Sequence, residues 1–203
     1  MILENLGFYV EKNFERVNNL MEIYEIITPK KKGRKPVKSL DLLRVTVVLL
    51  HASLEDYLRS LMKTLLPIAN KEYLKGIPLF LNQNEYRKTT KFELGELAEH
   101  RDLTVDSLIS LSVEQYLNRE SYNNTNEIAS ALERIGFAIT PEMTNLLNDL
   151  DKMIARRHNI VHQTDRELKD GQGFHEAKSI NYKQVKKWRN VVDKFMAEIV
   201  NQY

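Results

Sequence analysis

Apolar residues recur at three- and four-residue steps over most of the chain, which is the spacing of amphipathic helices. The first such stretch runs from residue 3 to about residue 28, and a second runs from residue 40 to about residue 66. Ser39 is the expected N-cap of the second stretch. Residues 42–50 are apolar nearly all round, so we predict that this second helix lies at the centre of the core.

The C-terminal half of the chain predicts further helices. Residues 121–126 are rich in helix-capping side chains and introduce a short helix. Residues 140–142 (Thr-Pro-Glu) then give an N-cap, a proline at the first position and an acid in the first turn, which is how a helix begins. A last helix is predicted over residues 182–203, with Trp188 on its inner side. Residues 70–124 indicate only short helices with weak boundaries.

Length and composition fit this helical pattern. The chain has 203 residues, of which 42% are hydrophobic and 29% charged, as in an ordinary globular protein with room for a core. We find no internal repeat and no convincing strand. We therefore expect an all-α fold, a bundle of four to five principal helices with shorter accessory helices, in a single domain over residues 1–203.

The absence of cysteine and the shortness of the apolar runs indicate in which cellular compartment the protein is expected. The chain has no cysteine, which rules out disulfides and thiolate catalysis and makes a structural zinc site improbable. The N-terminus lacks a basic region followed by an apolar run, and the longest apolar run, residues 45–50, is far too short to span a bilayer. We expect a cytoplasmic protein without a signal peptide or a membrane partner.

A basic segment joins the first two helices at about residues 29–38. The net charge of the chain is only +2, so any affinity for nucleic acid must come from local patches such as this one. One interpretation is a solvated, mobile linker, and the other is an arm that contacts the phosphates of RNA. The candidate RNA-contacting residues are Lys30, Lys31, Lys32, Arg34 and Lys35.

The densest group of chemically active side chains is the segment Arg157-His158-Asn159-Ile160-Val161-His162, which ends the helix that starts near residue 141. Arg157 falls where the apolar stripe predicts a hydrophobic residue. A charge on a buried face is costly unless it is paired, and Glu55 on the central helix is the candidate partner. His51, Glu55 and Arg59 also stand four residues apart, so a surface ladder of ion pairs is the alternative role for Glu55.

An arginine and a histidine together suit phosphodiester chemistry. Histidine transfers protons near neutral pH, and arginine offers phosphate a planar fork of donors with a permanent charge. If the neighbouring ribose 2′-hydroxyl is the nucleophile, no metal is needed and DNA is not a substrate. A five-residue step leaves Arg157 and His162 roughly 140° apart around an ideal helix. The arginine's reach, a helix end between them, or two copies facing each other would bring the groups together, and we expect a symmetric dimer.

This segment resembles the R-x4-6-H signature of the HEPN superfamily (higher eukaryotes and prokaryotes nucleotide-binding domains). The family arginine and histidine fall on Arg157 and His162, and its polar second residue falls on His158. An acidic residue on an earlier helix often supports the arginine in that family, and Glu55 resembles it; Asn159 is a further supporting candidate.

The resemblance implies a helical bundle that dimerises so that two motifs meet in one composite active site. It also implies a metal-independent endoribonuclease that needs no cofactor, with RNA as its substrate. Many members serve bacterial toxin–antitoxin, abortive-infection and CRISPR systems, so an antitoxin or another defence-system protein is an implied partner. Some members keep the fold without catalysis, which leaves a non-catalytic module that binds nucleotide, RNA or protein as the alternative.

Two further interpretations of the motif remain open from the sequence. His158 and His162 have the spacing of metal ligands and Asp165 could be a third, although the glutamate of the H-E-x-x-H zinc hydrolases is missing. In a wholly structural role, Arg157 would pair with Glu55 and the two histidines would cap the helix C-terminus.

Overall fold

The structure is a computed structural model that describes residues 2–31, 33–79, 94–167 and 177–203. Over these ranges it is all-α, as the sequence predicts, and the only β-type pairing is an isolated bridge between Arg166 and Ala177. None of the described helices is long and apolar enough to cross a membrane.

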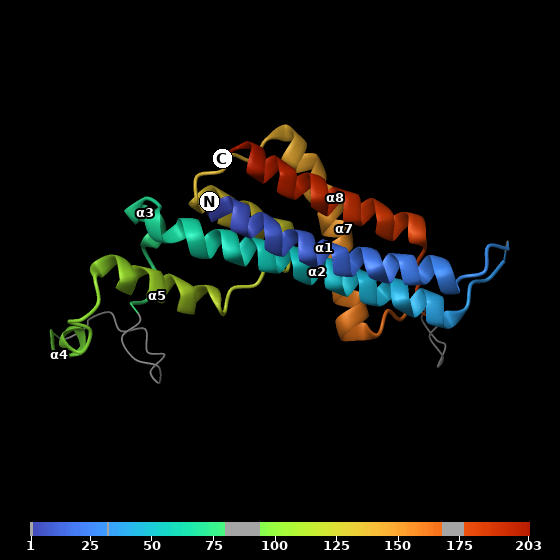
Figure 1. Cartoon of the computed structure of the whole chain (residues 1–203), viewed down its shortest axis with the longest axis horizontal. Coiled ribbons are helices and arrows are strands. Elements are labelled where there is room, and N and C mark those ends of the chain that lie inside the picture. Colours follow the sequence, from blue (N-terminus) through green and yellow to red (C-terminus); the bar gives the residue numbers. More distant parts are fainter. Residues whose placement is uncertain (1, 32, 80–93, 168–176) are drawn as a thin grey trace.

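Four long helices make up most of the bundle (Figure 1). They are α1 (Ile2–Ile27), α2 (Val37–Leu65), α7 (Pro141–Gln163) and α8 (Tyr182–Asn201). α1 and α2 lie side by side, joined by the basic linker at one end, and α2 also packs against α7 and α8. α2 is therefore the central helix of the bundle, as its apolar sequence predicts.

Shorter elements extend the bundle beside and beyond the far end of α2 (Figure 1). A 3-10 turn, η1 (Leu66–Ile68), and a one-turn helix, α3 (Lys71–Leu74), follow α2 directly. α4 (Leu94–Ala98), α5 (Val105–Leu117) and α6 (Thr125–Arg134) then lead back to α7. α5 packs on α2 and η1, and α6 packs on α2 and α7, so the weakly predicted middle of the chain covers one end of the central helix.

Among the described residues, all the buried hydrophobic side chains except Leu108 belong to one cluster. α2 contributes residues without solvent exposure at three- and four-residue steps, and α8 places Trp188 in the core at 3% exposure. These α2 residues are Leu43, Val47, Leu50, Leu54, Leu58 and Leu61. The predicted central position of α2 is confirmed, although Val45 in its apolar first half is 54% exposed.

The predicted helix starts are borne out in the second half of the chain but not at α2. The Thr140 hydroxyl accepts a hydrogen bond from the Met143 amide at 3.1 Å, and Pro141 is the first residue of α7. The prediction that Ser39 caps α2 is wrong, because α2 begins at Val37 and Ser39 is buried within its first turn. Pro36 occupies the N-cap with extended ψ, and its carbonyl accepts the first helical hydrogen bonds.

Candidate active site at the C-terminal end of α7

The motif lies on the last two turns of α7, which stays helical through Gln163. His158 and His162 are exposed, and their ring centroids lie 4.5 Å apart with the ring planes tilted by 43°. Asn159, which lies between them in the sequence, is half-buried. Since the helix ends after His162, no helix end separates it from Arg157, and the separation of roughly 140° expected for an ideal helix persists.

Arg157 lies on the same side of α7 as the core residues, but beyond the last of them. Leu150 and Ile154 on this side are buried, Arg157 is half-buried, and Val161 is 46% exposed. The Arg157 Nε atom is buried and has no hydrogen-bond partner among the described residues. The inward face of α7 thus becomes an open surface at the motif, with an apolar side chain beside the guanidinium.

Glu55 of α2 is held by its neighbours in a position that favours its charged form. Its Oε1 accepts a hydrogen bond from the Tyr122 amide at 3.2 Å, and its Oε2 lies 3.4 Å from His51 Nδ1. The close contact with His51 is the largest cause that lowers the pKa of Glu55 to about 2, although its 3.4 Å separation is not a well-formed hydrogen bond. The Tyr122 amide and the charges of His51 and Arg157 add to it, while burial opposes it. Glu55 thereby ties α2 to the segment that precedes α6.

The expected direct pairing of Glu55 with Arg157 is not present. Both residues are described, and no hydrogen bond or ion pair joins them. Arg157 acts on Glu55 only through its charge, as the last of the causes that lower the Glu55 pKa. The carboxylate instead uses its two oxygens on Tyr122 and His51, which lie closer.

Of the alternative surface ladder through His51, Glu55 and Arg59, only the contact between His51 and Glu55 is present, and it is not at the surface. His51 is only 1% exposed, so it belongs to the interior. Arg59 points away from Glu55 and donates to the carbonyls of Leu117 and Glu120. These bonds fix the C-terminal end of α5, and the spacing of four residues along α2 does not make a ladder.

Asp165, two residues beyond α7, is the residue that sequence reasoning undervalued. It is fully buried, and its Oδ2 accepts hydrogen bonds from Arg44 Nε at 2.7 Å and Arg156 Nη2 at 2.8 Å. Both guanidiniums bind Oδ2, while the buried Oδ1 has no hydrogen-bond partner among the described residues. Within the described ranges, no three His, Cys, Asp or Glu residues are grouped as a metal site would require.

The basic linker lies at one end of the bundle, where it joins α1 to α2 (Figure 1). Lys30, Lys31 and Arg34 are exposed, while Lys35 turns back and donates to the carbonyls of Pro29 and Lys31. Lys32 lies outside the described residues. A hollow of about 820 Å³ runs beside the linker, lined by Lys30 and Lys35 but also by two glutamates, Glu22 and Glu25.

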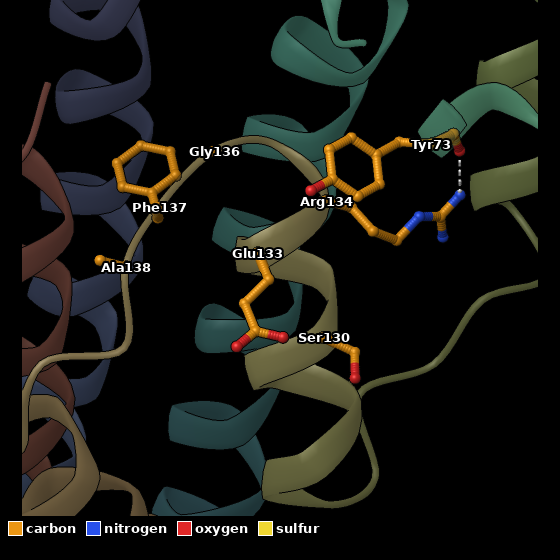
Figure 2. A pocket seen from close by; sticks show the side chains of 7 residues that line it. All are labelled: Tyr73, Ser130, Glu133, Arg134, Gly136, Phe137 and Ala138. Atoms are coloured by element: carbon orange, nitrogen blue, oxygen red, sulfur yellow. Dashed lines mark hydrogen bonds between the residues drawn. The ribbon is translucent and has the colours of Figure 1, made fainter. Parts of the chain in front are cut away.

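A separate hollow of about 590 Å³ lies at the C-terminal end of α6 (Figure 2). Tyr73, Glu133, Arg134 and Phe137 are among the residues that line it, and Arg134 donates to the Tyr73 carbonyl at 3.1 Å. Neither this hollow nor the one beside the linker is lined by any residue of the motif. His158, Val161 and His162 of the motif are exposed to solvent.

One comparison with known proteins gives a match over nearly the whole chain. A family model described as RiboL-PSP-HEPN matches residues 11–203, which include all of α2, α7 and α8. No curated protein and no solved structure matches the chain significantly.

Proposed function

The chain belongs to the RiboL-PSP-HEPN family of the HEPN superfamily, and on that premise we propose that it is a metal-independent endoribonuclease. The observation that carries the proposal is the placement of Arg157 and His162 within the family match, on the solvent-open end of α7. His158, Asn159 and Glu55 support the site.

The reaction is a transesterification within the RNA chain. His162 takes the proton from a ribose 2′-hydroxyl, whose oxygen attacks the adjacent phosphorus. The bond to the 5′-oxygen of the next nucleotide breaks, and that oxygen receives a proton from a second imidazole, such as His158 or the one on another copy. The products are a 2′,3′-cyclic phosphate and a 5′-hydroxyl. Arg157 stabilises the extra negative charge on the phosphoryl oxygens.

A symmetric dimer completes the site. Arg157 and His162 diverge around one continuous helix, so one α7 does not aim both groups at one phosphate. A second copy facing the first would place the His162 of one chain beside the Arg157 of the other. Val161, 46% exposed next to the motif, and Val45, 54% exposed on α2, provide apolar surface for such a contact.

The proposal extends to the contact with RNA outside the motif, to the biological role and to a partner protein. The exposed cations at Lys30, Lys31 and Arg34 extend the contact with the RNA backbone, which is a source of salt-sensitive affinity. A cytoplasmic ribonuclease of this kind suits a role in bacterial defence or toxicity. An antitoxin or another defence-system protein would then be the partner that restrains it.

The decisive experiment incubates the purified protein with single-stranded RNA in excess EDTA. Cleavage should persist, leave 2′,3′-cyclic phosphate ends and be absent for DNA of the same sequence. His162→Ala should abolish it, whereas His100→Ala, between α4 and α5, serves as a matched histidine control and should cleave normally. Loss of cleavage in EDTA with wild-type protein would instead indicate a metal hydrolase.

The composite site is tested by mixing two inactive variants. Arg157→Ala and His162→Ala homodimers each lack one group in both halves, but their heterodimer keeps one arginine and one histidine on opposite chains. Cleavage should return on mixing in proportion to the heterodimer fraction. If the mixture stays inactive while mass spectrometry shows heterodimers, the two groups must act from the same chain.

The non-catalytic module is the alternative outcome of the same assays. Its support is that no residue of the motif lines the hollows beside the linker and at α6. It predicts intact RNA at high protein concentration, together with binding that weakens as salt is raised.

A further inference from the structure

Asp165 joins α2 and α7 through one carboxylate oxygen, and the same two arginines reach the segment before α8. Arg44 of α2 and Arg156 of α7 both donate to its Oδ2, and each arginine also donates to the Lys178 carbonyl, at 2.9 Å and 3.0 Å. Arg156 adds a bond to the carbonyl of Ser179, which precedes α8. We call Arg44, Asp165 and Arg156 the carboxylate clamp. The bond between Arg44 and Asp165 joins two residues that are 121 positions apart in the sequence.

The backbone at the clamp adopts a conformation that requires such support. Thr164 and Asp165 have φ angles of 50° and 57°, in the left-handed region that residues with a side chain seldom occupy. The Asp165 amide donates to the Asn159 carbonyl at 2.9 Å, and its carbonyl accepts from the Lys178 amide at 2.7 Å. Two successive left-handed residues end α7 sharply, and the buried carboxylate holds them there.

His162 lies at the end of α7, close to the clamp in sequence. It belongs to the last turn of α7, three residues before Asp165. Both the backbone bond to Asn159 and the bonds of the clamp therefore fix the turn that carries the imidazole. Arg156 of the clamp also precedes Arg157, so the same cluster anchors the two sides of the motif.

We propose that Asp165 is a positioning residue, which through Arg44 and Arg156 holds the end of α7, and with it His162, in place for catalysis. This inference rests on the proposed ribonuclease function and deepens it. Asp165 is buried and does not touch substrate; it acts through the helix end. A displacement of about 1 Å at a catalytic group is enough to lower the rate about 100-fold.

The kinetic test compares two clamp variants with two controls. Asp165→Asn keeps the shape but removes the charge, and Arg44→Lys keeps the charge but loses the double hold on Asp165 and the Lys178 carbonyl. We expect kcat to fall about 100-fold in Asp165→Asn and less in Arg44→Lys. KM should stay within about threefold of wild type, since the RNA-contacting groups are untouched.

The controls separate positioning from a general loss of stability. Asp149→Asn breaks surface ion pairs of α7 with Lys152 and Lys187, and Ile154→Val lowers stability from within the α7 core. Both controls should retain kcat when assayed well below their melting temperatures. If Asp165→Asn retains wild-type kcat while folded, or loses no more than Ile154→Val at equal stability, the proposal is overturned.

A second measurement does not depend on activity. Amide hydrogen exchange over residues 159–165 should be at least tenfold faster in Asp165→Asn and unchanged in Asp149→Asn. The His162 Cε1–H resonance should shift or broaden in Asp165→Asn, with the His100 resonance as internal reference. If wild-type protein fails to cleave RNA, the proposed function falls, and these readouts still decide whether Asp165 positions His162: unchanged exchange and an unchanged His162 resonance would refute it.

Discussion

Glu55→Gln tests the electrostatic network behind the motif. The substitution preserves the shape of the side chain and an oxygen for the Tyr122 amide but removes the negative charge. It also turns an acceptor near His51 Nδ1 into an amide donor or a weaker acceptor. The charged form of Glu55 is the one that the fold favours, so the cost of the change should depend on pH.

The magnitude follows from the pKa of Glu55, which its surroundings, the contact with His51 first among them, lower from 4.5 to about 2. A difference of roughly 2.5 pKa units corresponds to about 3 kcal/mol of stability when the group is ionised in both states. Since 19% of the side chain is exposed, solvent screening reduces the expected loss to about 2 kcal/mol.

The sign sets the pH window. The folded-state pKa lies below the unfolded one, so the contribution is fully present above pH 4.5 and is lost as pH falls toward 2. Glu55→Gln should therefore be about 2 kcal/mol less stable than wild type at pH 7, and the difference should shrink steadily from pH 4.5 downward.

Urea unfolding followed by circular dichroism at pH 7, 5, 4 and 3 measures this difference. Asp56→Asn is the matched control, because Asp56 is exposed and accepts a single bond from Asn13 at 3.0 Å. We expect the control to lose at most about 0.5 kcal/mol at every pH. A Glu55→Gln loss that stays constant between pH 7 and 3, or one no larger than that of the control, would refute the reasoning.

Three further predictions concern the site and the fold. Arg157→Ala should abolish RNA cleavage while light scattering shows an unchanged dimer fraction and thermal melting shows little loss of stability, because its Nε has no partner to lose among the described residues. Val161→Asp should shift the protein from dimer to monomer in the same light-scattering assay, since it puts a charge on the 46% exposed apolar side chain beside the motif. Thr140→Ala should cost about 1 kcal/mol in denaturant unfolding and leave cleavage unaffected, as it removes the N-cap at the opposite end of α7.

The fold was predictable where the signal is local and periodic. The apolar residues of α2 and α8, three or four positions apart, specify both the helix and its buried side. Thr140 specifies where α7 begins. Each of these signals lies within a few residues of the feature that it predicts. Ser39 failed as a cap because Pro36, three residues earlier, supplies the fixed φ and extended ψ of an N-cap. A strong capping residue therefore marks a helix start only when no earlier residue can begin the helix.

The contacts that shape the candidate site were not predictable in the same way. Arg157 and His162 are close in sequence and were found by their chemistry. The burial of His51 depends on which side of α2 faces the interior, and the partners of Asp165 lie on Arg44 and before α8. A left-handed aspartate carries no mark in the sequence, since glycine is the residue that normally indicates this conformation. The sequence feature that came closest to indicating the partners of Asp165 was Arg44, a charged residue in a mostly apolar stretch of α2.

The distribution of acids around the motif explains how Arg157 can serve an anionic substrate. Asp165 binds Arg44 and Arg156, and Glu55 contacts Tyr122 and His51, so both of these acids are engaged elsewhere. Among the described residues, no carboxylate lies within ion-pair distance of Arg157. An arginine neutralised by its own protein would offer a phosphate less charge and would have to break a bond to bind it. The guanidinium of the half-buried Arg157 is therefore not neutralised by an ion pair within the described residues, and a phosphate could bind it without breaking one. Glu55 interacts with it only through its charge, without direct contact.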